Sequence, residues 1–279
     1  MVWGIIILVI ILLACAFLFF ITPAKASEAL RPGFYAHRGL HTRDKSVPEN
    51  SMAAFAKAAD CGYGIELDVQ LTKDGQVVVF HDFNLLRVCR EARMLKDCTY
   101  EQLQGYPLEN TAQTIPLFSE VLKLIGGRVP LIIELKNESF SNELEKKTAE
   151  LLKNYQGGFC IESFNPFSVR WFKRHVPRIV RGQLLTSFDK EGGVRSKLRR
   201  VILQNLLLNF LAKPQFIACN YLYYKNFPVR WCRFRGCALA AWTIRDEETI
   251  EQLQKDFDII IFEHFLPKVK EDKCQINKA

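Results

Sequence analysis

The sequence lacks charged side chains in its first stretch, and none occurs before Lys25. Residues 3–21 are almost wholly apolar. At ~1.5 Å per residue, a helix of this length spans roughly 28 Å, close to the hydrocarbon thickness of a bilayer. A cleaved signal peptide is disfavoured, because no basic segment precedes the run and the run exceeds a usual h-region. We therefore predict a retained transmembrane helix over residues 1–22.

This segment also allows a second interpretation, and the charges beside it predict its topology. The segment LLAC (12–15) resembles a bacterial lipoprotein cleavage box. Cleavage there would leave the apolar AFLFFIT at the new N-terminus, so a retained anchor is favoured. Lys25 and Arg31 flank only the C-terminal side, which favours a cytoplasmic main domain. We expect a single-pass protein of the cell membrane with a linker over 23–32.

No CxxC pair occurs among the nine cysteines. The wider pairs, Cys89 with Cys98 and Cys232 with Cys237, have no zinc-like partner set. We interpret most cysteines as small buried thiols in a reducing compartment. A disulfide between Cys89 and Cys98 would contradict this interpretation.

No zinc-finger or RNA-binding signature accompanies the basic clusters RSKLRR (195–200) and VRWCRFR (229–235). The formal net charge is nevertheless +8. We therefore expect no nucleic acid, and interpret the charge as suited to a membrane face or a phosphate substrate. The sequence indicates no particular protein partner.

The chain has no internal repeat or low-complexity segment, and its strand-like runs alternate with helical ones. We predict strands over 34–39, 64–72, 130–136, 159–164, 179–185, 216–221, 238–244 and 258–262. We predict helices over 49–61, 116–125, 141–155, 166–175, 196–212, 225–235 and 246–256. This alternation is typical of an α/β (β/α)8 TIM barrel. We place it at residues 33–270, followed by a C-terminal tail over 271–279.

A further strand-like run, 77–82, does not fit the parallel pattern. Only KDG (73–75) separates it from the preceding strand, whereas a parallel crossover needs about a dozen residues. The two runs must therefore form an antiparallel hairpin, with Asp74 as a turn residue. Residues 83–114 then have little periodicity. We predict a barrel distorted near its second strand by this hairpin and a small insertion.

Acidic and basic side chains occur where several strands end. Glu66 and Asp68 share one face of a strand, because side chains alternate. Glu134 repeats the arrangement in LIIELK, while His37 and His81 end two other strands. In a barrel these groups gather at the C-terminal rim, where such folds place active sites.

The chemistry of these groups suggests a cation and a phosphate. Converging carboxylates repel one another unless some protonate or a cation lies between them. Oxygen ligands suit Mg²⁺ or Ca²⁺ rather than zinc. Arg38 and Lys136 lie beside them, and a guanidinium matches phosphate oxygens. Two histidines can serve as base and acid in displacement at phosphorus.

Taken in order, several motifs resemble those of the glycerophosphodiester phosphodiesterase family. They are HRG (37–39), PENSMAAFAKAADCGYGIELDVQLTKDG (48–75), VVVFHD (77–82), IPLFSEVL (115–122), IIELK (132–136), ESF (162–164) and AWTI (241–244). The resemblance covers residues 33–267 and implies a TIM barrel with an insertion after the second strand. It also implies metal-dependent hydrolysis of glycerophosphodiesters to glycerol 3-phosphate and an alcohol.

The resemblance also implies roles for individual residues. Glu66, Asp68 and Glu134 would bind the metal, while His37 and His81 would form the acid/base pair. Arg38 and Lys136 would contact the phosphate. Phe164 and Trp242 would line the site against the glycerol or the leaving group, although core packing is an equal alternative for both.

Some features leave alternatives open. Glu263 and His264 stand where the family commonly has an Asp, and His41 and His175 match no role. Residues 196–213 fit a barrel helix with a wide buried face better than an interfacial helix on anionic lipid. A lysophospholipid substrate, cleavage through a cyclic phosphate, and an inactive membrane-tethered phosphate-binding module are the alternative functions.

Overall fold

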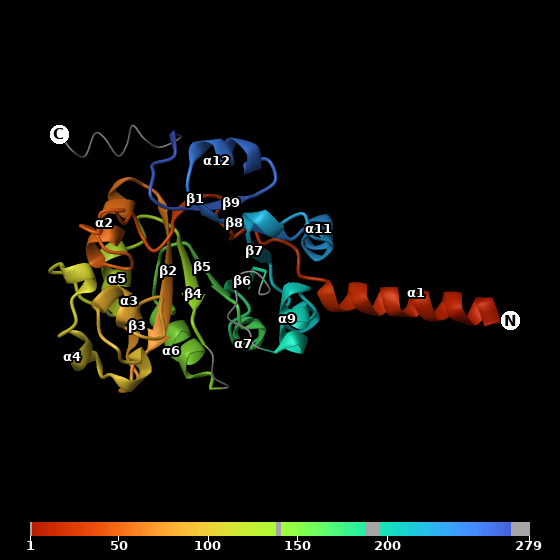
Figure 1. The fold of residues 1–279 in the computed structure, drawn as a ribbon, viewed down its shortest axis with the longest axis horizontal. Helices are drawn as coiled ribbons and strands as arrows, with labels where there is room; N and C mark the ends of the chain where they lie inside the picture. The colour runs from red at the N-terminus through yellow and green to blue at the C-terminus, as the bar shows by residue number, and fades with distance from the viewer. Residues whose placement is uncertain (1, 138–140, 188–195, 269–279) are drawn as a thin grey trace.

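The computed structural model describes residues 2–137, 141–187 and 196–268 (Figure 1). Its central feature is a closed parallel barrel, because β1 pairs with both β9 and β2. The barrel strands are β1 (Gly33–Ala36), β2 (Gly64–Leu71), β4 (Leu131–Leu135), β5 (Phe159–Ser163), β6 (Val180–Leu185), β7 (Phe216–Asn220), β8 (Ala238–Ile244) and β9 (Ile259–Phe262). The predicted (β/α)8 fold is confirmed. The predicted tail, 271–279, lies outside the described residues.

Helices surround the barrel, as Figure 1 shows. They are α2 (Met52–Asp60), α5 (Phe118–Ile125), α6 (Glu143–Leu152), α7 (Pro166–His175), α9 (Lys197–Gln204), α10 (Asn209–Ala212), α11 (Phe227–Phe234) and α12 (Glu247–Leu253). Side chains at alternate positions of the strands face outward under these helices, as Ile65 and Leu67 do in the sheet–helix core. The intervening positions face the interior.

The barrel interior is filled by a second apolar cluster that includes Tyr35, Ile132 and Phe216. Gly182 makes room for the largest of these rings, because a Cβ there would lie 2.2 Å from the Phe216 ring. Burying such side chains contributes about 1.5–3 kcal/mol each. This packing closes the barrel and leaves the strand ends to carry polar groups.

The predicted hairpin is confirmed, since β3 (Val77–Val79) pairs antiparallel with β2. The insertion that follows has helices α3 (Leu86–Cys89) and α4 (Tyr100–Leu103) and 3-10 turns η1 (Leu95–Asp97) and η2 (Leu108–Asn110). Phe80 and Leu103 belong to its own small core. This core fixes the return strand against the barrel.

The segment 196–212 differs from the expected single helix. It breaks between α9 and α10, where Leu206 adopts a left-handed φ of 56°. No residue of α9 is buried, and Leu198 and Val201 are exposed. The expected wide buried face is therefore wrong for α9, because only α10 returns to the barrel, through Asn209 and Ala212.

The apolar N-terminal segment forms helix α1 (Val2–Ile21), which projects from the barrel between α9 and α11 (Figure 1). The C-terminal end of α1 is hydrogen-bonded to the domain by side chains of the segment around α10. Asn209 donates to the Ile21 carbonyl at 3.0 Å, and Lys213 donates to the Thr22 carbonyl at 3.0 Å. The direction in which α1 leaves is thus set by hydrogen bonds with the domain.

Among the cysteines that the structure describes, seven are free thiols, and six of these are buried. Cys89 and Cys98 are both among the free ones, as predicted. Cys61 takes part in a disulfide, so the thiol interpretation is wrong at that position.

Candidate active site

Carboxylates occupy one level of the barrel interior. The strand register places Asp68 of β2 beside Glu134 of β4, and Glu134 beside Glu162 of β5. Glu66, Asp68 and Glu134 are buried, and their ligand oxygens lie within 4.8 Å of one another. The three carboxylates predicted from alternation therefore do come together.

Both predicted cations lie among these carboxylates. Lys136 Nζ is 3.2 Å from Asp68 Oδ1 and 2.9 Å from Glu134 Oε1. Arg38, with a left-handed φ of 54°, donates its backbone N–H to Glu66 Oε2 at 3.0 Å. Its Nε lies 3.6 Å from Asp68 Oδ2. The cluster thus already contains the groups expected to bind phosphate.

Burial and mutual repulsion act on the pKa values of the cluster. Burial, followed by the charge of Asp68, raises the pKa of Glu66 well above its usual value. Burial likewise raises the pKa of Glu134, although Lys136 opposes the shift. Burial also acts to raise the pKa of Asp68, but Lys136, His81 and Arg38 together lower it. Full ionisation of the cluster therefore needs more positive charge than these side chains supply.

A divalent cation fits this cluster. All three candidate ligands are oxygen donors, which suits Mg²⁺ or Ca²⁺. Asp68 Oδ1 is buried and, apart from its ion pair with Lys136, has no hydrogen-bond partner among the described residues. A cation there would satisfy that oxygen and favour the ionised forms of its neighbours.

Glu162 is a fourth carboxylate that the sequence analysis missed. It is only 1% exposed, and its Oε2 has no hydrogen-bond partner among the described residues. Burial, followed by the charges of Glu134 and Asp68, raises its pKa well above the usual value. The sequence does contain a sign of it, because Glu162 lies in the ESF motif at the end of the strand that follows the Glu134 strand.

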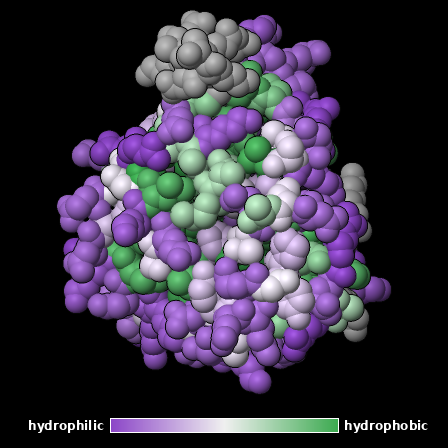
Figure 2. All heavy atoms as spheres, turned by 90° about the vertical axis from the view of Figure 1, so that its left-hand side faces the viewer, coloured by the Kyte–Doolittle hydropathy of each residue, from purple (hydrophilic) through white to green (hydrophobic). Residues whose placement is uncertain are grey.

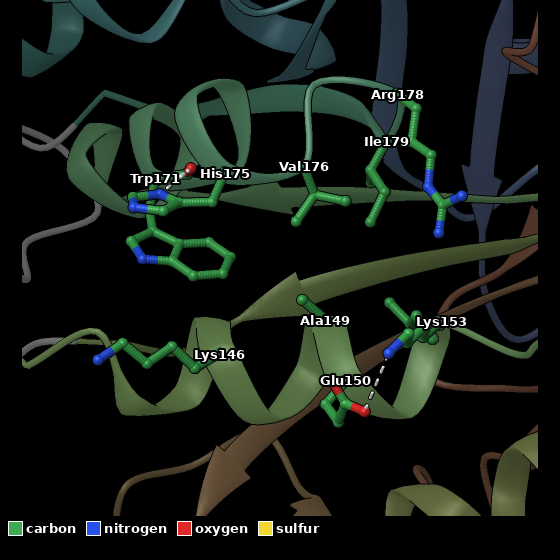
Figure 3. Close-up of a pocket in the computed structure, with 10 residues that line it drawn as sticks. Lys146, Ala149, Glu150, Lys153, Trp171, His175, Val176, Arg178 and Ile179 are labelled. Atoms are coloured by element: carbon green, nitrogen blue, oxygen red, sulfur yellow. Dashed lines mark hydrogen bonds and ion pairs between the residues drawn. The ribbon is translucent and has the colours of Figure 1, made fainter.

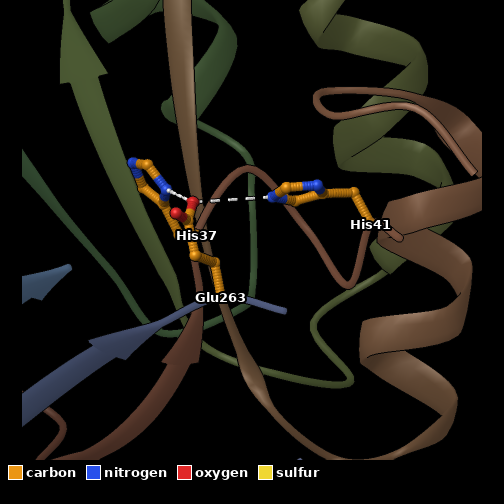
Figure 4. Close-up of side chains that lie close together, drawn as sticks. All are labelled: His37, His41 and Glu263. Carbon is orange, nitrogen blue, oxygen red and sulfur yellow. Dashed lines mark hydrogen bonds and ion pairs between the residues drawn. The ribbon is translucent and has the colours of Figure 1, made fainter. Parts of the chain in front are cut away.

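His37 lies between the carboxylate cluster and Glu263. Its Nδ1 is 2.7 Å from Glu263 Oε2 (Figure 4), and its Nε2 is 3.9 Å from Glu66 Oε2. Burial and the charge of Arg38 lower the pKa of His37 to about 4, although the bond to Glu263 opposes them. His37 is therefore a neutral imidazole near pH 7, held in orientation by Glu263.

His41 also faces Glu263, with its Nε2 3.8 Å from Glu263 Oε2 (Figure 4). No role could be predicted for this histidine, because nothing in the loop after β1 marks it in the sequence. Glu263 instead follows β9, which pairs with β1 through Ala36 and Phe262. This pairing brings residues from the two ends of the domain together.

His81 stands on the insertion side of the cluster. Its Nδ1 lies 2.6 Å from Asp82 Oδ1, so Asp82 orients the ring. Asp82 also accepts from Arg87 Nε at 2.7 Å, and Arg87 bonds Glu49 through both terminal nitrogens. Arg87 was missed because the insertion has no periodicity that marks it.

The two predicted aromatic residues meet at the edge of the interior cluster. The Phe164 and Trp242 rings are perpendicular, with centroids 6.0 Å apart. Both are partly buried and pack against the barrel interior. Trp242 Nε1 has no hydrogen-bond partner among the described residues.

Two cavities differ in their relation to this cluster. One, of about 430 Å³, is lined by His37 and Arg38 together with charged residues of nearby loops. The other, of about 420 Å³, lies between α6 and α7 (Figure 3). Its His175 stacks on Trp171 at 4.5 Å, which gives this histidine a packing role away from the candidate site.

Known proteins are similar to this chain in sequence and in fold. The profile of the glycerophosphoryl diester phosphodiesterase family matches residues 37–264. A protein named glycerophosphodiester phosphodiesterase from Bacillus altitudinis is 39% identical over 157 residues, 52% of this chain and 63% of that protein. Another of that name, from Caldanaerobacter subterraneus, is 31% identical over 233 residues, 79% of this chain and 88% of that protein.

Solved structures support the fold. A phosphodiesterase of Oleispira antarctica, in complex with the product sn-glycerol-3-phosphate, has a TM-score of 0.70 and 24% identity, covering 88% of this chain and 97% of that chain. A glycerophosphodiester phosphodiesterase from Parabacteroides distasonis has a TM-score of 0.66 and 22% identity, covering 90% and 100%. The chain therefore belongs to the glycerophosphoryl diester phosphodiesterase family, whose members are phosphoric diester hydrolases.

Proposed function

We propose that this protein hydrolyses glycerophosphodiesters to glycerol 3-phosphate and an alcohol, with a divalent cation. The observation that carries the proposal is the buried carboxylate cluster with a carboxylate-braced histidine on each side. The relatives from Bacillus altitudinis and Caldanaerobacter subterraneus are both named glycerophosphodiester phosphodiesterases, which supports the same reaction here.

Glu66, Asp68 and Glu134 would hold the cation, Mg²⁺ or Ca²⁺. When bound, such an ion polarises a phosphoryl oxygen and neutralises charge that develops on it. Arg38 and Lys136 would bind the remaining phosphate oxygens, exchanging part of their contact with the carboxylates for the substrate. The phosphorus is thereby oriented with respect to the two histidines.

The two histidines divide proton transfer in this proposal. His37, neutral and oriented by Glu263, takes a proton from the attacking water. His81, as an imidazolium stabilised by Asp82, gives a proton to the departing alkoxide. One phosphorus–oxygen bond forms to the water oxygen and one breaks to the alcohol. Phe164 and Trp242 would pack against the glycerol moiety.

Attack by a glycerol hydroxyl instead of water would pass through a cyclic phosphate. A cyclic product seen by ³¹P NMR during turnover would favour that route over direct hydrolysis. Replacement of every diester by glycerol 3-phosphate, without a cyclic species, would favour water as the nucleophile.

We also propose that α1 anchors the protein in a membrane. The helix has 20 residues and a mean hydropathy of 3.4, and only 6% of its span is buried against the domain. Exposed apolar residues continue beside its root, with Leu198 and Val201 on α9 and Phe227 and Phe234 on α11. The face opposite α1 is instead mostly hydrophilic (Figure 2). We expect α9 and α11 to lie against the lipid surface.

A membrane position makes a lysophospholipid a second candidate substrate. A human lysophospholipase D is 37% identical over 120 residues, 38% of this chain and 37% of that protein. Protease protection on intact cells tests the proposed cytoplasmic side. Digestion of the domain from outside would place it on the other face.

The decisive experiment for the activity is a diester panel with metal titration. Glycerophosphocholine, glycerophosphoethanolamine and a lysophospholipid are each incubated with Mg²⁺, Ca²⁺ or EDTA. We expect release of glycerol 3-phosphate, or of lysophosphatidic acid from the lipid, with either metal and none with EDTA. A folded protein that cleaves no diester with any metal would overturn the proposal and favour a binding module.

A further inference from the structure

The cavity beside His37 continues away from the carboxylate cluster, and most of its lining has no part in the proposed hydrolysis. Loops from four places meet there. Thr42, Arg43 and Lys45 come from the loop after β1, Arg87 and Glu109 from the insertion, Arg245 from the segment after β8, and His264 from the segment after β9. Because His37 and Arg38 also line it, a group attached to the scissile phosphate would enter this cavity.

The lining carries an excess of positive charge. Five cationic and three acidic side chains line the cavity, an excess of two cations, although Arg38 also contacts Asp68 and Arg87 also contacts Asp82 outside the lining. The cations are Arg38, Arg43, Lys45, Arg87 and Arg245, and the carboxylates are Glu49, Glu109 and Glu263. The sign of this excess disfavours a cationic group such as choline or ethanolamine.

Each carboxylate of the lining is already held by basic groups. Glu49 bonds both Arg38 and Arg87, and Glu263 bonds Arg245 at 2.6 Å as well as His37. Glu109 pairs with Lys45 at 2.9 Å and also with Arg90. In the described part of the chain, Arg43 has no carboxylate within ion-pair distance. Its guanidinium is therefore available to a ligand.

Two histidines of the lining lie together, and one of them has an unused hydrogen-bonding group. The His41 side chain is only 8% exposed and its Nε2 faces Glu263 Oε2 at 3.8 Å, whereas His264 Nδ1 has no hydrogen-bond partner among the described residues. Their rings lie edge to face with centroids 4.7 Å apart. Burial, followed by the charges of His41, Arg43 and Arg245, lowers the pKa of His264 despite the opposing charge of Glu263. Ring N–H donors in a positive surrounding suit an anionic oxygen.

We propose that this cavity is the subsite for the alcohol and that the preferred alcohol carries a second phosphate group. A guanidinium fork presents paired donors that match phosphate oxygens, and Arg43 and His264 line the same cavity with donors that no described residue uses. This inference rests on the proposed hydrolysis and adds the chemical class of the substrate.

A matched pair of diesters tests the inference. Glycerophosphoinositol and glycerophosphoinositol 4-phosphate differ only in the second phosphate. At low ionic strength we expect kcat/KM to be about tenfold higher for the phosphorylated diester. The ratio should fall with added salt, because exposed charges such as Arg43 are screened.

Variants locate the effect in the cavity. Arg43→Gln should lower the ratio by about threefold, as expected for an exposed charge, and Arg43→Glu should lower it further. Arg174→Gln removes the same charge from the exposed end of α7, outside the cavity, and should leave the ratio unchanged. A ratio that responds equally to both glutamine variants would reflect net charge alone and would overturn the subsite.

The two proposals fail in different ways. Equal kcat/KM for both diesters, insensitive to salt and to Arg43→Gln, overturns the anionic-alcohol inference and leaves the hydrolase intact. Absence of turnover of both diesters with Mg²⁺ and with Ca²⁺ overturns the hydrolase itself. A preference for the unphosphorylated diester would show that the excess charge serves another purpose and also overturns the inference.

Discussion

The two histidines of the candidate site each face a carboxylate, but their surroundings differ. His37 is 16% exposed and bonds Glu263, which stands 226 positions away along the chain. His81 is 31% exposed and bonds Asp82, the next residue. One pair is built by the closure of the barrel, and the other by a single bend in the insertion.

The difference bears on proton transfer. Burial and Arg38 keep His37 neutral, which suits a base that must accept a proton near pH 7. Asp82 remains ionised at low pH, because bonds from His81 and Arg87 lower its pKa despite burial. An ionised partner stabilises an imidazolium, which suits His81 as the acid. The comparison thus supports the different tasks that we propose for the two histidines.

The largest expected effect comes from removing either histidine. We expect His37→Ala and His81→Ala each to lower kcat on glycerophosphocholine by about 10³-fold. A diester with a nitrophenol leaving group needs no protonation, so His81→Ala should recover most of its activity on that substrate. His37→Ala should not recover.

Thermal unfolding controls for folding in both variants. If His37→Ala were the variant rescued by nitrophenol, the assigned tasks would be reversed. Wild-type activity in either variant would contradict a role in proton transfer.

A smaller effect is expected from removing the carboxylate of each pair. Glu263→Gln should lower kcat by about tenfold or more, because His37 loses its orienting acceptor. The Glu263 bond raises the pKa of His37, so its loss lowers that pKa further, and the acid limb of kcat/KM moves to lower pH. Asp82→Asn should lower kcat less than Glu263→Gln does. Arg87 keeps its hydrogen bond to Glu49, so the loop that carries His81 stays in place.

The pH profiles of the two variants are the measurement. An acid limb that stays at the wild-type pH in Glu263→Gln would show that this carboxylate does not act through His37. Asp82→Asn is the matched comparison, because Asp82 contacts His81 rather than His37 and its loss should leave the acid limb in place.

The two pairs also explain what the sequence could predict. Alternation placed Glu66 and Asp68 on one face, and strand ends marked His37, Arg38 and Lys136, because both patterns depend only on nearby residues. The KDG turn predicted the hairpin that brings His81 back to the cluster. His81 and Asp82 are adjacent, so their pairing was also visible.

The features that could not be predicted depend on contacts between segments far apart in the sequence or on local backbone conformation. Glu263 could not be assigned, because its partner His37 is reached only when β9 pairs with β1. Arg87 lies in an insertion whose order comes from its own small core rather than from a periodic pattern. The break before α10 depends on the left-handed Leu206, a conformation that its side chain does not favour.

The carboxylate cluster between the two histidines should make stability depend on metal and pH. The folded-state pKa values of Glu66 and Glu134 are raised, so stability without metal is greatest below the usual value of 4.5 and falls as pH rises through the folded-state values. A cation binds the ionised form and should stabilise by about 2.7 kcal/mol at a hundredfold excess over Kd.

We therefore expect Mg²⁺ or Ca²⁺ to raise Tm more at pH 8 than at pH 5.5. Differential scanning calorimetry with metal and with EDTA measures the difference. Glu66→Gln should remove most of the increase. An increase that is the same at both pH values would argue that the cation binds elsewhere.

The smallest expected effect concerns Glu162, which shares the level of the cluster but is not part of either proton-transfer pair. Burial, followed by the charges of Glu134 and Asp68, raises its pKa, so ionisation near pH 8 costs folding free energy. Glu162→Gln should stabilise the metal-free protein by about 1 kcal/mol at pH 8 and hardly at pH 5, with kcat kept within a few-fold. Loss of turnover together with loss of the metal-induced increase in Tm would instead make Glu162 a fourth ligand, and the site between the histidines would extend to β5.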